Sequence, residues 1–221
     1  MKGREFKDAV FEQFARVASA FSSPKRVEIV DLLAQGERAV ESIAEATGMT
    51  MANTSRHLQV LRQANLVSTR RQGIQVWYRI ADTSVIEGYR GLRAMTEARV
   101  GEVSALAEAF FSDVDGAEPV GIAELVARAD SGKVLVVDVR PRLEFEAGHL
   151  PGAVNIPLDD LAGRISELDQ STTVVAYCRG PYCVLSAQAV SQLRRAGLEA
   201  QRLDGGPLEW DAAGLPLAVG A

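Results

Sequence analysis

The sequence predicts two domains of different fold class: a mainly helical N-terminal half and an α/β C-terminal half built on a parallel sheet. In the first half, apolar residues recur every three or four positions, which is typical of amphipathic helices. In the second half, apolar runs such as VLVVDV and TTVVAY alternate with helical segments, which is the pattern of parallel strand–helix units. Acids, Gly and Pro interrupt the helical periodicity at SDVDGAEPVG. We therefore expect domains at residues 1–112 and 121–221, joined by a linker at residues 113–120.

The composition is that of an ordinary globular protein, with 221 residues of which 47% are hydrophobic and 24% charged. No apolar run is long enough for a membrane span, and the N-terminus shows no secretory signal, so a cytoplasmic location without membrane contact is expected. In that compartment, a close pair of cysteines is more often catalytic, redox-active or metal-binding than a structural disulfide.

The elements of the first half follow from caps and periodicity. A first amphipathic helix is expected from Phe6 to Phe21, and a second in SSPKRVEIVDLLAQG, with Pro24 at its first position and Gly36 as its stop. A short helix in ERAVESIAEATG and a third helix from Thr50 follow. Strands in LVSTRR and VWYRIAD then flank the turn QGIQ. Residues 83–111 form a long helical stretch whose apolar stripe exceeds what one small domain covers, so a homodimer is expected.

Two short helices, the turn GMT, a third helix and a two-stranded wing describe a winged helix-turn-helix, in which residues 50–64 would enter the major groove of DNA. The charge distribution agrees, because residues 1–112 carry a net +2, residues 113–221 a net −7, and residues 46–81 contain no acid. Polar side chains on the third helix and the wing are the candidate DNA contacts: Thr50, Asn53, Thr54, Ser55, Arg56, His57, Gln59, Arg62, Arg70, Arg71 and Gln72.

These residues resemble the ArsR-type bacterial repressors, most densely in TSRHLQVLRQANLV and in RRQG followed by VWYRI. The resemblance implies a homodimeric winged-helix repressor bound to a promoter palindrome, which releases DNA when a metal or an oxidised sulfur species binds. Several members carry a Cys-x-Cys metal site, but here the matching positions are Ala39 and Glu41. We therefore expect no metal and no other cofactor.

The second half alternates between strands and helices. Strands are expected in KVLVVDVR, GAVNIP, TTVVAYC and EAQRL, and helices in RLEFEAG, LDDLAGRISEL and VLSAQAVSQLRRAG. The turn CRGPYC, residues 178–183, joins one of these strands to the following helix and holds both cysteines of the chain. Backbone N–H groups and the helix dipole converge at such a turn, so the Cys178 thiolate is expected to be accessible near neutral pH.

This half resembles the rhodanese domains, on the elements VLVVDVR, GHLPGAVNIPL, the cysteine turn and RLDGGPLEW. The resemblance implies that Cys178 takes sulfane sulfur as a persulfide and that the amides of the turn hold the terminal sulfur. The candidate catalytic residues are those of the turn itself: Cys178, Arg179, Gly180, Pro181, Tyr182 and Cys183.

Two departures from the family pattern matter. Many active rhodaneses have Arg at the sixth position of the turn, where this chain has Cys183, so thiosulfate turnover is disfavoured. Related phosphatases and arsenate reductases use Cys-x5-Arg, and here the corresponding residue is Val184, so oxyanion-ester chemistry is not expected.

The second cysteine of the turn has two interpretations. Cys183 either resolves a modified Cys178 as a disulfide or polysulfide bridge, or is a small residue packed under the helix. A two-thiol arsenic site is a further alternative, while His149, Asp138 and Arg140 are interpreted as scaffold.

Together these features predict a homodimeric transcriptional repressor whose rhodanese-like domain senses reactive sulfur species or thiol oxidants through Cys178. Its partners would be double-stranded DNA and small sulfur species or low-molecular-weight thiols. Two other functions stay open: a sulfurtransferase whose winged helix serves autoregulation or localisation, and a rhodanese-like module that binds a partner while Cys178 is idle.

Overall fold

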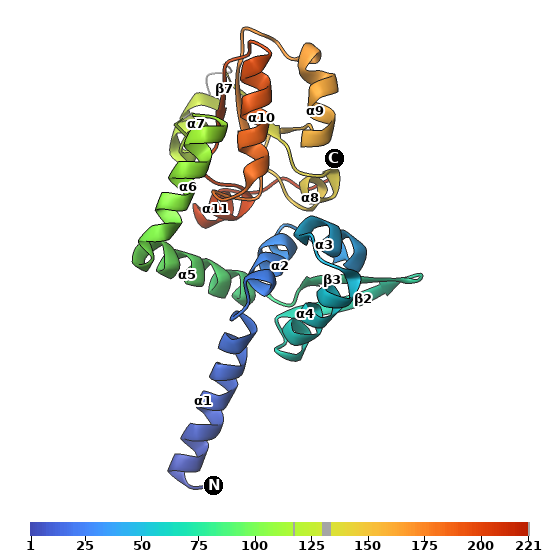
Figure 1. The fold of residues 1–221 in the computed structure, drawn as a ribbon, viewed down its shortest axis with the longest axis vertical. Coiled ribbons are helices and arrows are strands. Elements are labelled where there is room, and N and C mark those ends of the chain that lie inside the picture. Colours follow the sequence, from blue (N-terminus) through green and yellow to red (C-terminus); the bar gives the residue numbers. More distant parts are fainter. Residues whose placement is uncertain (117, 130–133, 221) are drawn as a thin grey trace. The chain divides into compact units, whose positions relative to one another are not determined.

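The computed structural model describes residues 1–116, 118–129 and 134–220 (Figure 1). By packing, the chain forms two compact units, Met1–Thr96 and Glu97–Ala221, each of which has its own core. In the part of the chain that the structure describes, no helix is long and apolar enough to cross a membrane.

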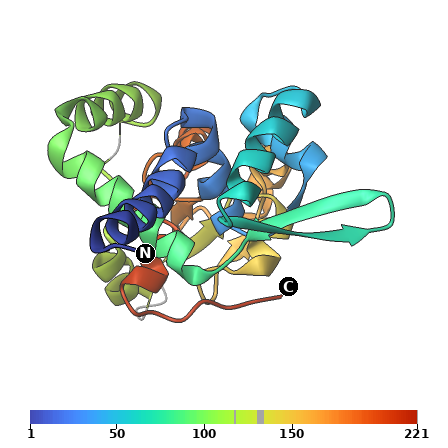
Figure 2. The same ribbon diagram turned by 90° about the horizontal axis from the view of Figure 1, so that it is seen from below.

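The first unit consists of helices and a small antiparallel sheet. Its elements are α1 (Gly3–Ala20), α2 (Pro24–Ala34), β1 (Arg38–Ala39), α3 (Val40–Thr47), α4 (Met51–Gln63), β2 (Val67–Gln72), β3 (Gln75–Ile80) and most of α5 (Thr83–Arg99). The sheet order is β1-β3-β2, and Figure 2 shows the β2–β3 hairpin projecting as a wing from the helices of this unit. This order of elements confirms the predicted winged helix-turn-helix.

Local sequence signals set the ends of these elements. Pro24 begins α2, where its missing N–H is not needed, and Gly48 ends α3 in the left-handed conformation at φ 62°. Thr50 caps α4 by accepting a hydrogen bond from the Asn53 amide at 3.4 Å. Leu58 and Leu61 of α4 are fully buried, as expected for the side of the helix that packs on the core.

The second unit contains a four-stranded parallel sheet with strand order β5-β4-β6-β7. Its strands are β4 (Val134–Asp138), β5 (Val154–Asn155), β6 (Thr173–Tyr177) and β7 (Ala200–Arg202). Its helices are α6 (Gly101–Val114), α7 (Ile122–Ala129), α8 (Arg142–Ala147), α9 (Leu158–Arg164), α10 (Val184–Arg195) and α11 (Pro207–Ala212), with a short 3-10 turn at Ile165–Glu167. The predicted parallel α/β architecture is confirmed.

Alternation along β6 divides its side chains between two cores. Val174, Ala176 and Cys178 belong to the core that includes residues of α9 and α10. Val175 and Tyr177 belong to the other core, which includes residues of α7 and α11. Strand periodicity thus directs the side chain that follows β6, that of Cys178, toward α10.

The segment between the predicted domains differs from expectation. The predicted helical stretch over residues 83–111 is two helices, because the backbone is extended at Val100 (φ −117°, ψ 92°). Helix α6 groups with the second unit, whereas the expected domain boundary places it in the first. Its last turn meets β7: the Arg202 guanidinium lies 4.0 Å from the centre of the Phe111 ring and pairs with Asp115 at 3.1 Å.

Candidate functional site

Helix α4 presents most of the predicted DNA-contacting side chains on its surface. Thr50, Asn53, Arg56, Gln59 and Arg62 are exposed, and Ser55 and His57 are half-buried. These positions follow the helical period opposite the buried Leu58 and Leu61. The helix therefore offers amide, hydroxyl and guanidinium donors on one face, which is what reading base edges and phosphates requires.

Thr54 is a correction to that set. We predicted an outward-facing side chain, but Thr54 is fully buried, and its hydroxyl donates to the Thr50 carbonyl at 3.0 Å. Its position, four residues before Leu58, puts it on the packed side of α4 rather than on the polar side. Thr54 therefore stabilises the start of the helix and does not reach a ligand.

The wing carries Arg70, Arg71 and Gln72, all exposed. Arg70 forms a forked ion pair with Glu37, with Nε 2.8 and 2.9 Å from the two carboxylate oxygens, and its guanidinium lies 5.0 Å from the centre of the Trp77 ring. Hydrogen bonding from Arg70 lowers the pKa of Glu37. No local sequence pattern predicts this partner, since Glu37 precedes Arg70 by 33 residues. The pair fixes the direction of the Arg70 side chain.

The cysteine loop, residues 178–183, lies between β6 and α10, at the carboxyl edge of the parallel sheet. Gly206 packs directly against it. A Cβ atom added at Gly206 would stand 2.5 Å from the Cys178 carbonyl oxygen and 2.7 Å from the Arg179 carbonyl. Only glycine fits at this contact, so the segment before α11 holds the base of the loop. Gly206 lies in the stretch RLDGGPLEW, and its role in holding the loop was not predicted from the sequence.

The Cys178 side chain is not accessible as predicted. It is 0% exposed, and its thiol donates toward the Cys183 carbonyl oxygen at 3.4 Å and the Ser186 hydroxyl at 3.3 Å. Burial, followed by the interaction with Cys183, raises the pKa of the Cys178 thiol well above its usual value. The expectation of an accessible Cys178 thiolate near neutral pH is therefore wrong for the protein in this state.

Cys183 has the opposite character. It is half-buried and forms the N-cap of α10. A hydrogen bond from the Cys178 thiol lowers the pKa of Cys183 to about 7, against the effect of burial and with help from the Arg179 and Leu185 amides and the Arg179 charge. Both cysteines are free thiols. The more acidic thiol, on the less buried of the two residues, is thus at the end of the loop and not at its start.

Arg179 is held by a carboxylate that the sequence analysis did not single out. Its guanidinium donates to both oxygens of Glu144, at 2.7 to 3.1 Å, and Glu144 is only 1% exposed. Glu144 belongs to α8, 35 residues away in sequence. Arg179, the one cation of the loop, is therefore ion-paired. The pair holds the loop in its conformation in addition to placing a positive charge there.

The residues interpreted as scaffold form a buried polar frame under the loop. Asp138 and Arg140 pair at 2.6 Å with both side chains fully buried, and Arg140 also donates to the Gly148 carbonyl at 2.8 Å. The His149 ring stacks on Phe145 with its centre at 3.6 Å, and its Nδ1 lies 2.9 Å from the Phe145 carbonyl oxygen. Across the described residues, no cluster of three or more His, Cys, Asp or Glu could hold a metal ion.

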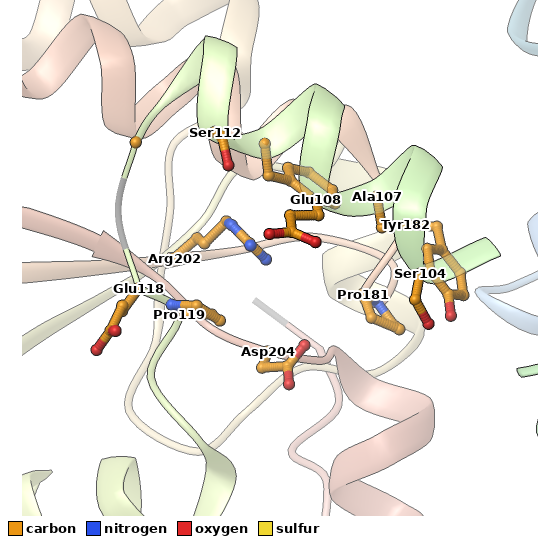
Figure 3. Close-up of a pocket in the computed structure, with 12 residues that line it drawn as sticks. Ser104, Ala107, Glu108, Ser112, Glu118, Pro119, Pro181, Tyr182, Arg202 and Asp204 are labelled. Carbon is orange, nitrogen blue, oxygen red and sulfur yellow. The ribbon is translucent and has the colours of Figure 1, made fainter. Parts of the chain in front are cut away.

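A cavity of about 770 Å³ flanks the cysteine loop within the second unit (Figure 3). Ser104, Glu108 and Ser112 line it from α6, while Arg202 and Asp204 line it from β7 and the residues after it. Pro181 and Tyr182 bring the loop itself to its wall. Tyr182 is exposed, and its hydroxyl donates to Glu97 of α5 at 2.9 Å. This hydrogen bond ties the loop to the end of that helix.

Comparison with known proteins matches each half of the chain to a family. Residues 23–69 match the model of the bacterial regulatory proteins of the arsR family, and residues 122–213 match that of the rhodanese-like domain. The HTH-type transcriptional regulator Rv0324 of Mycobacterium tuberculosis is 46% identical over 217 residues, which cover 97% of this chain and 94% of that protein. A sulfurtransferase of Allochromatium vinosum is 36% identical over 41% of this chain and 84% of its own length.

A solved structure is similar to the N-terminal half. It is the homodimeric winged helix-turn-helix DNA-binding domain of a possible ArsR-family regulator from Mycobacterium bovis, 41% identical over 45% of this chain and 91% of that chain, with a TM-score of 0.42. The two family matches and the near full-length similarity to a regulator lead to one assignment. The chain belongs to the ArsR family of bacterial transcriptional regulators and carries a rhodanese-like domain after its winged helix-turn-helix.

Proposed function

We propose that this protein is a homodimeric repressor that binds a promoter palindrome and whose rhodanese-like domain senses reactive sulfur species or thiol oxidants through Cys178 and Cys183. The observation that carries the proposal is the thiol pair itself. The only two cysteines of the chain lie in one loop, within hydrogen-bonding range of each other, in a protein whose other half is a DNA-binding fold. A pair of thiols in such contact is a candidate for oxidation to a disulfide, which would constrain the loop between them.

The first unit supports the DNA and homodimer parts of the proposal. The polar face of α4 and the wing supply the groups that bind a duplex. Helix α1 exposes Phe6, Phe11, Phe14 and Val17 at 41 to 64%. An exposed apolar face of this kind is expected to be covered by a second copy of the chain, which would also place two recognition helices on the two halves of a palindrome.

The link between the loop and the DNA-binding unit is proposed to run through Tyr182. Tyr182 precedes Cys183 in the loop, and its hydroxyl bonds to Glu97 in α5, a helix that has residues in both units. Closing a bond between the two cysteines would change the loop backbone on either side of Tyr182. The hydrogen bond to Glu97 would then shift or break. Because Glu97 lies in α5, the loss of this contact would change which conformation of α5 is favoured.

The direct test measures DNA affinity before and after sulfur treatment. An operator is first selected from a random duplex library, and its binding is followed by fluorescence anisotropy with and without polysulfide. We expect polysulfide to change the Kd of the wild-type protein about tenfold, and to leave that of the Cys178→Ser/Cys183→Ser double variant unchanged. An equal response in the double variant would refute the sensing proposal.

The proposed link has its own test. Tyr182→Phe keeps the ring and removes the hydroxyl, so unmodified DNA affinity should be retained while the response to polysulfide falls about two- to fivefold. Glu97→Gln keeps an oxygen acceptor for the tyrosine and is the matched control, which should respond like wild type. If Tyr182→Phe responds to polysulfide as fully as wild type, this hydrogen bond does not couple the loop to DNA binding.

The alternative function, a sulfurtransferase, is favoured by the similarity to the sulfurtransferase of Allochromatium vinosum. Burial of Cys178 and the ion pair that holds Arg179 speak against rapid turnover of an anionic donor. Steady-state sulfur transfer from thiosulfate to cyanide separates the two functions. The repressor proposal expects a rate no higher than that of the double cysteine variant.

A further inference from the structure

Within this proposed function, the structure assigns the two cysteines an order of reaction. We propose that Cys183 is the thiol that first accepts sulfane sulfur from a low-molecular-weight persulfide, and that Cys178 then displaces sulfide to close a disulfide. This reverses the roles implied by the family resemblance, in which the first cysteine of the turn carries the sulfur.

Accessibility is the first argument. Cys178 is 0% exposed and belongs to the core that includes Ala189 and Val190 of α10. Gly206 closes the loop from the other direction, in contact with the Cys178 and Arg179 carbonyls. Cys183 packs against the same core but is only half-buried, between the exposed Tyr182 and Val184. A donor molecule in solution therefore meets Cys183 first.

The hydrogen-bonding partners of the two sulfur atoms are the second argument. The Cys178 sulfur faces a carbonyl oxygen at 3.4 Å and a hydroxyl at 3.3 Å. The Ser186 hydroxyl and amide favour the Cys178 thiolate, but burial and the interaction with Cys183 outweigh them, so this environment keeps the Cys178 thiol protonated. The Cys183 sulfur instead receives donors, namely the Cys178 thiol and the amides of Arg179 and Leu185. Such donors stabilise a thiolate, which is the nucleophilic form.

The electrostatics agree with this geometry. Cys183 lies at the N-terminus of α10, a helix of 12 residues, where the dipole favours negative charge. Arg179 adds a positive charge that Glu144 partly balances, and the Cys178 thiol is a second titratable group in contact with Cys183. The lower pKa of the pair falls on Cys183 and the higher one on Cys178.

The reaction balances without any further oxidant. The Cys183 thiolate attacks the outer sulfur of R–S–SH, the S–S bond of the donor breaks, and R–S⁻ leaves, so that Cys183–S–SH forms. The Cys178 thiol then loses its proton and attacks the Cys183 sulfur atom. The bond to the added sulfur breaks, and that sulfur leaves with the proton as H₂S. Two thiols are oxidised to a disulfide, and the sulfane sulfur is reduced to sulfide.

Single variants separate the two steps. Each full-length variant is treated with glutathione persulfide under anaerobic conditions and followed by intact mass and by sulfide release. We expect Cys178→Ser to gain one sulfur atom and to stop there, because the resolving thiol is missing. Cys183→Ser should be modified about tenfold more slowly or not at all, because its remaining thiol is buried and protonated. Wild type should lose two hydrogen atoms and release one sulfide.

A second measurement guards against variants that fold poorly. In the wild-type protein, limited alkylation with iodoacetamide should label Cys183 before Cys178, with a midpoint near the pKa of about 7. Trypsin cleaves after Arg179 and thereby places the two cysteines on separate peptides, so the two rates are read in one sample. Faster labelling of Cys178, or sulfur uptake by Cys183→Ser at the wild-type rate, would overturn the proposed order.

The order of reaction and the proposed function fail in different ways. If the disulfide forms in the proposed order but DNA affinity does not change, the order stands and the sensing function is wrong. If DNA affinity responds while Cys178 is modified first, the sensing function stands and the order is wrong.

Discussion

The recognition helix α4 and the cysteine loop place their functional side chains in opposite environments. On α4, most polar residues lie on the surface while Leu58 and Leu61 pack inward, so the period of the helix largely separates them. In the loop, Cys178 is fully buried and the neighbouring Arg179 is held by the buried Glu144. A surface for DNA is thus specified by one short stretch of sequence, whereas the chemistry of a buried loop depends on residues brought in from elsewhere in the fold.

The largest expected effect tests whether the conformation of the cysteine loop depends on the segment before α11 that packs against it. Gly206→Ala puts a methyl group 2.5 Å from the Cys178 carbonyl oxygen, so the loop or the segment before α11 must move. We expect a loss of about 2–4 kcal/mol in the free energy of unfolding of the second unit, measured by urea denaturation. Gly163→Ala is the control, since it lies in α9 with open space around its Cβ position and should change stability little. Equal stability of both variants would mean that the loop tolerates displacement.

The next effect tests the polar face of α4. Arg56→Ala should weaken operator binding about tenfold and lower the salt dependence of binding, because an exposed guanidinium is lost from the proposed interface with DNA. Thr54→Val is the comparison from the buried side of the same helix. It removes the hydroxyl bond to Thr50 and should change thermal stability rather than the salt dependence. A change in salt slope for Thr54→Val would place that residue at the DNA after all.

The smallest effect concerns Arg70, a predicted DNA contact that is already ion-paired with a carboxylate. Glu37→Gln removes the carboxylate that pairs with Arg70. We expect operator affinity to rise about two- to fivefold at low salt. In this variant the Arg70 guanidinium can bind a DNA phosphate without first breaking its ion pair with Glu37. Arg70→Gln in the same assay should lower affinity. If Glu37→Gln weakens binding instead, the ion pair orients Arg70 for DNA rather than competing with it.

Much of the fold followed from local patterns. Caps such as Pro24, Gly48 and Thr50, and the alternation of strands and helices after residue 121, predict the order of elements because each depends on neighbours in the chain. The break at Val100 was missed, since the apolar stripe continues on both sides of it. Burial of Thr54 was also missed, because a threonine is compatible with either face of a helix.

The candidate site was predictable in position but not in chemistry. The strand–loop–helix context located the cysteine pair. Which thiol keeps its proton depends on the Cys183 carbonyl, the Ser186 hydroxyl and the packing of Gly206, none of which a sequence pattern specifies. Long-range pairs such as Arg179 with Glu144 likewise form only when the sheet brings α8 beside the loop.

The Arg179–Glu144 pair also bears on which molecules the loop admits. A buried carboxylate at 2.7 Å balances part of the positive charge that the guanidinium would otherwise present to solvent. Doubly charged oxyanions gain little from approaching such a site, and they lose their hydration on entry. Neutral or singly charged hydropersulfides lose far less. If the loop takes sulfane sulfur as proposed, we expect this ion pair to favour small sulfane-sulfur carriers over thiosulfate before any covalent step takes place.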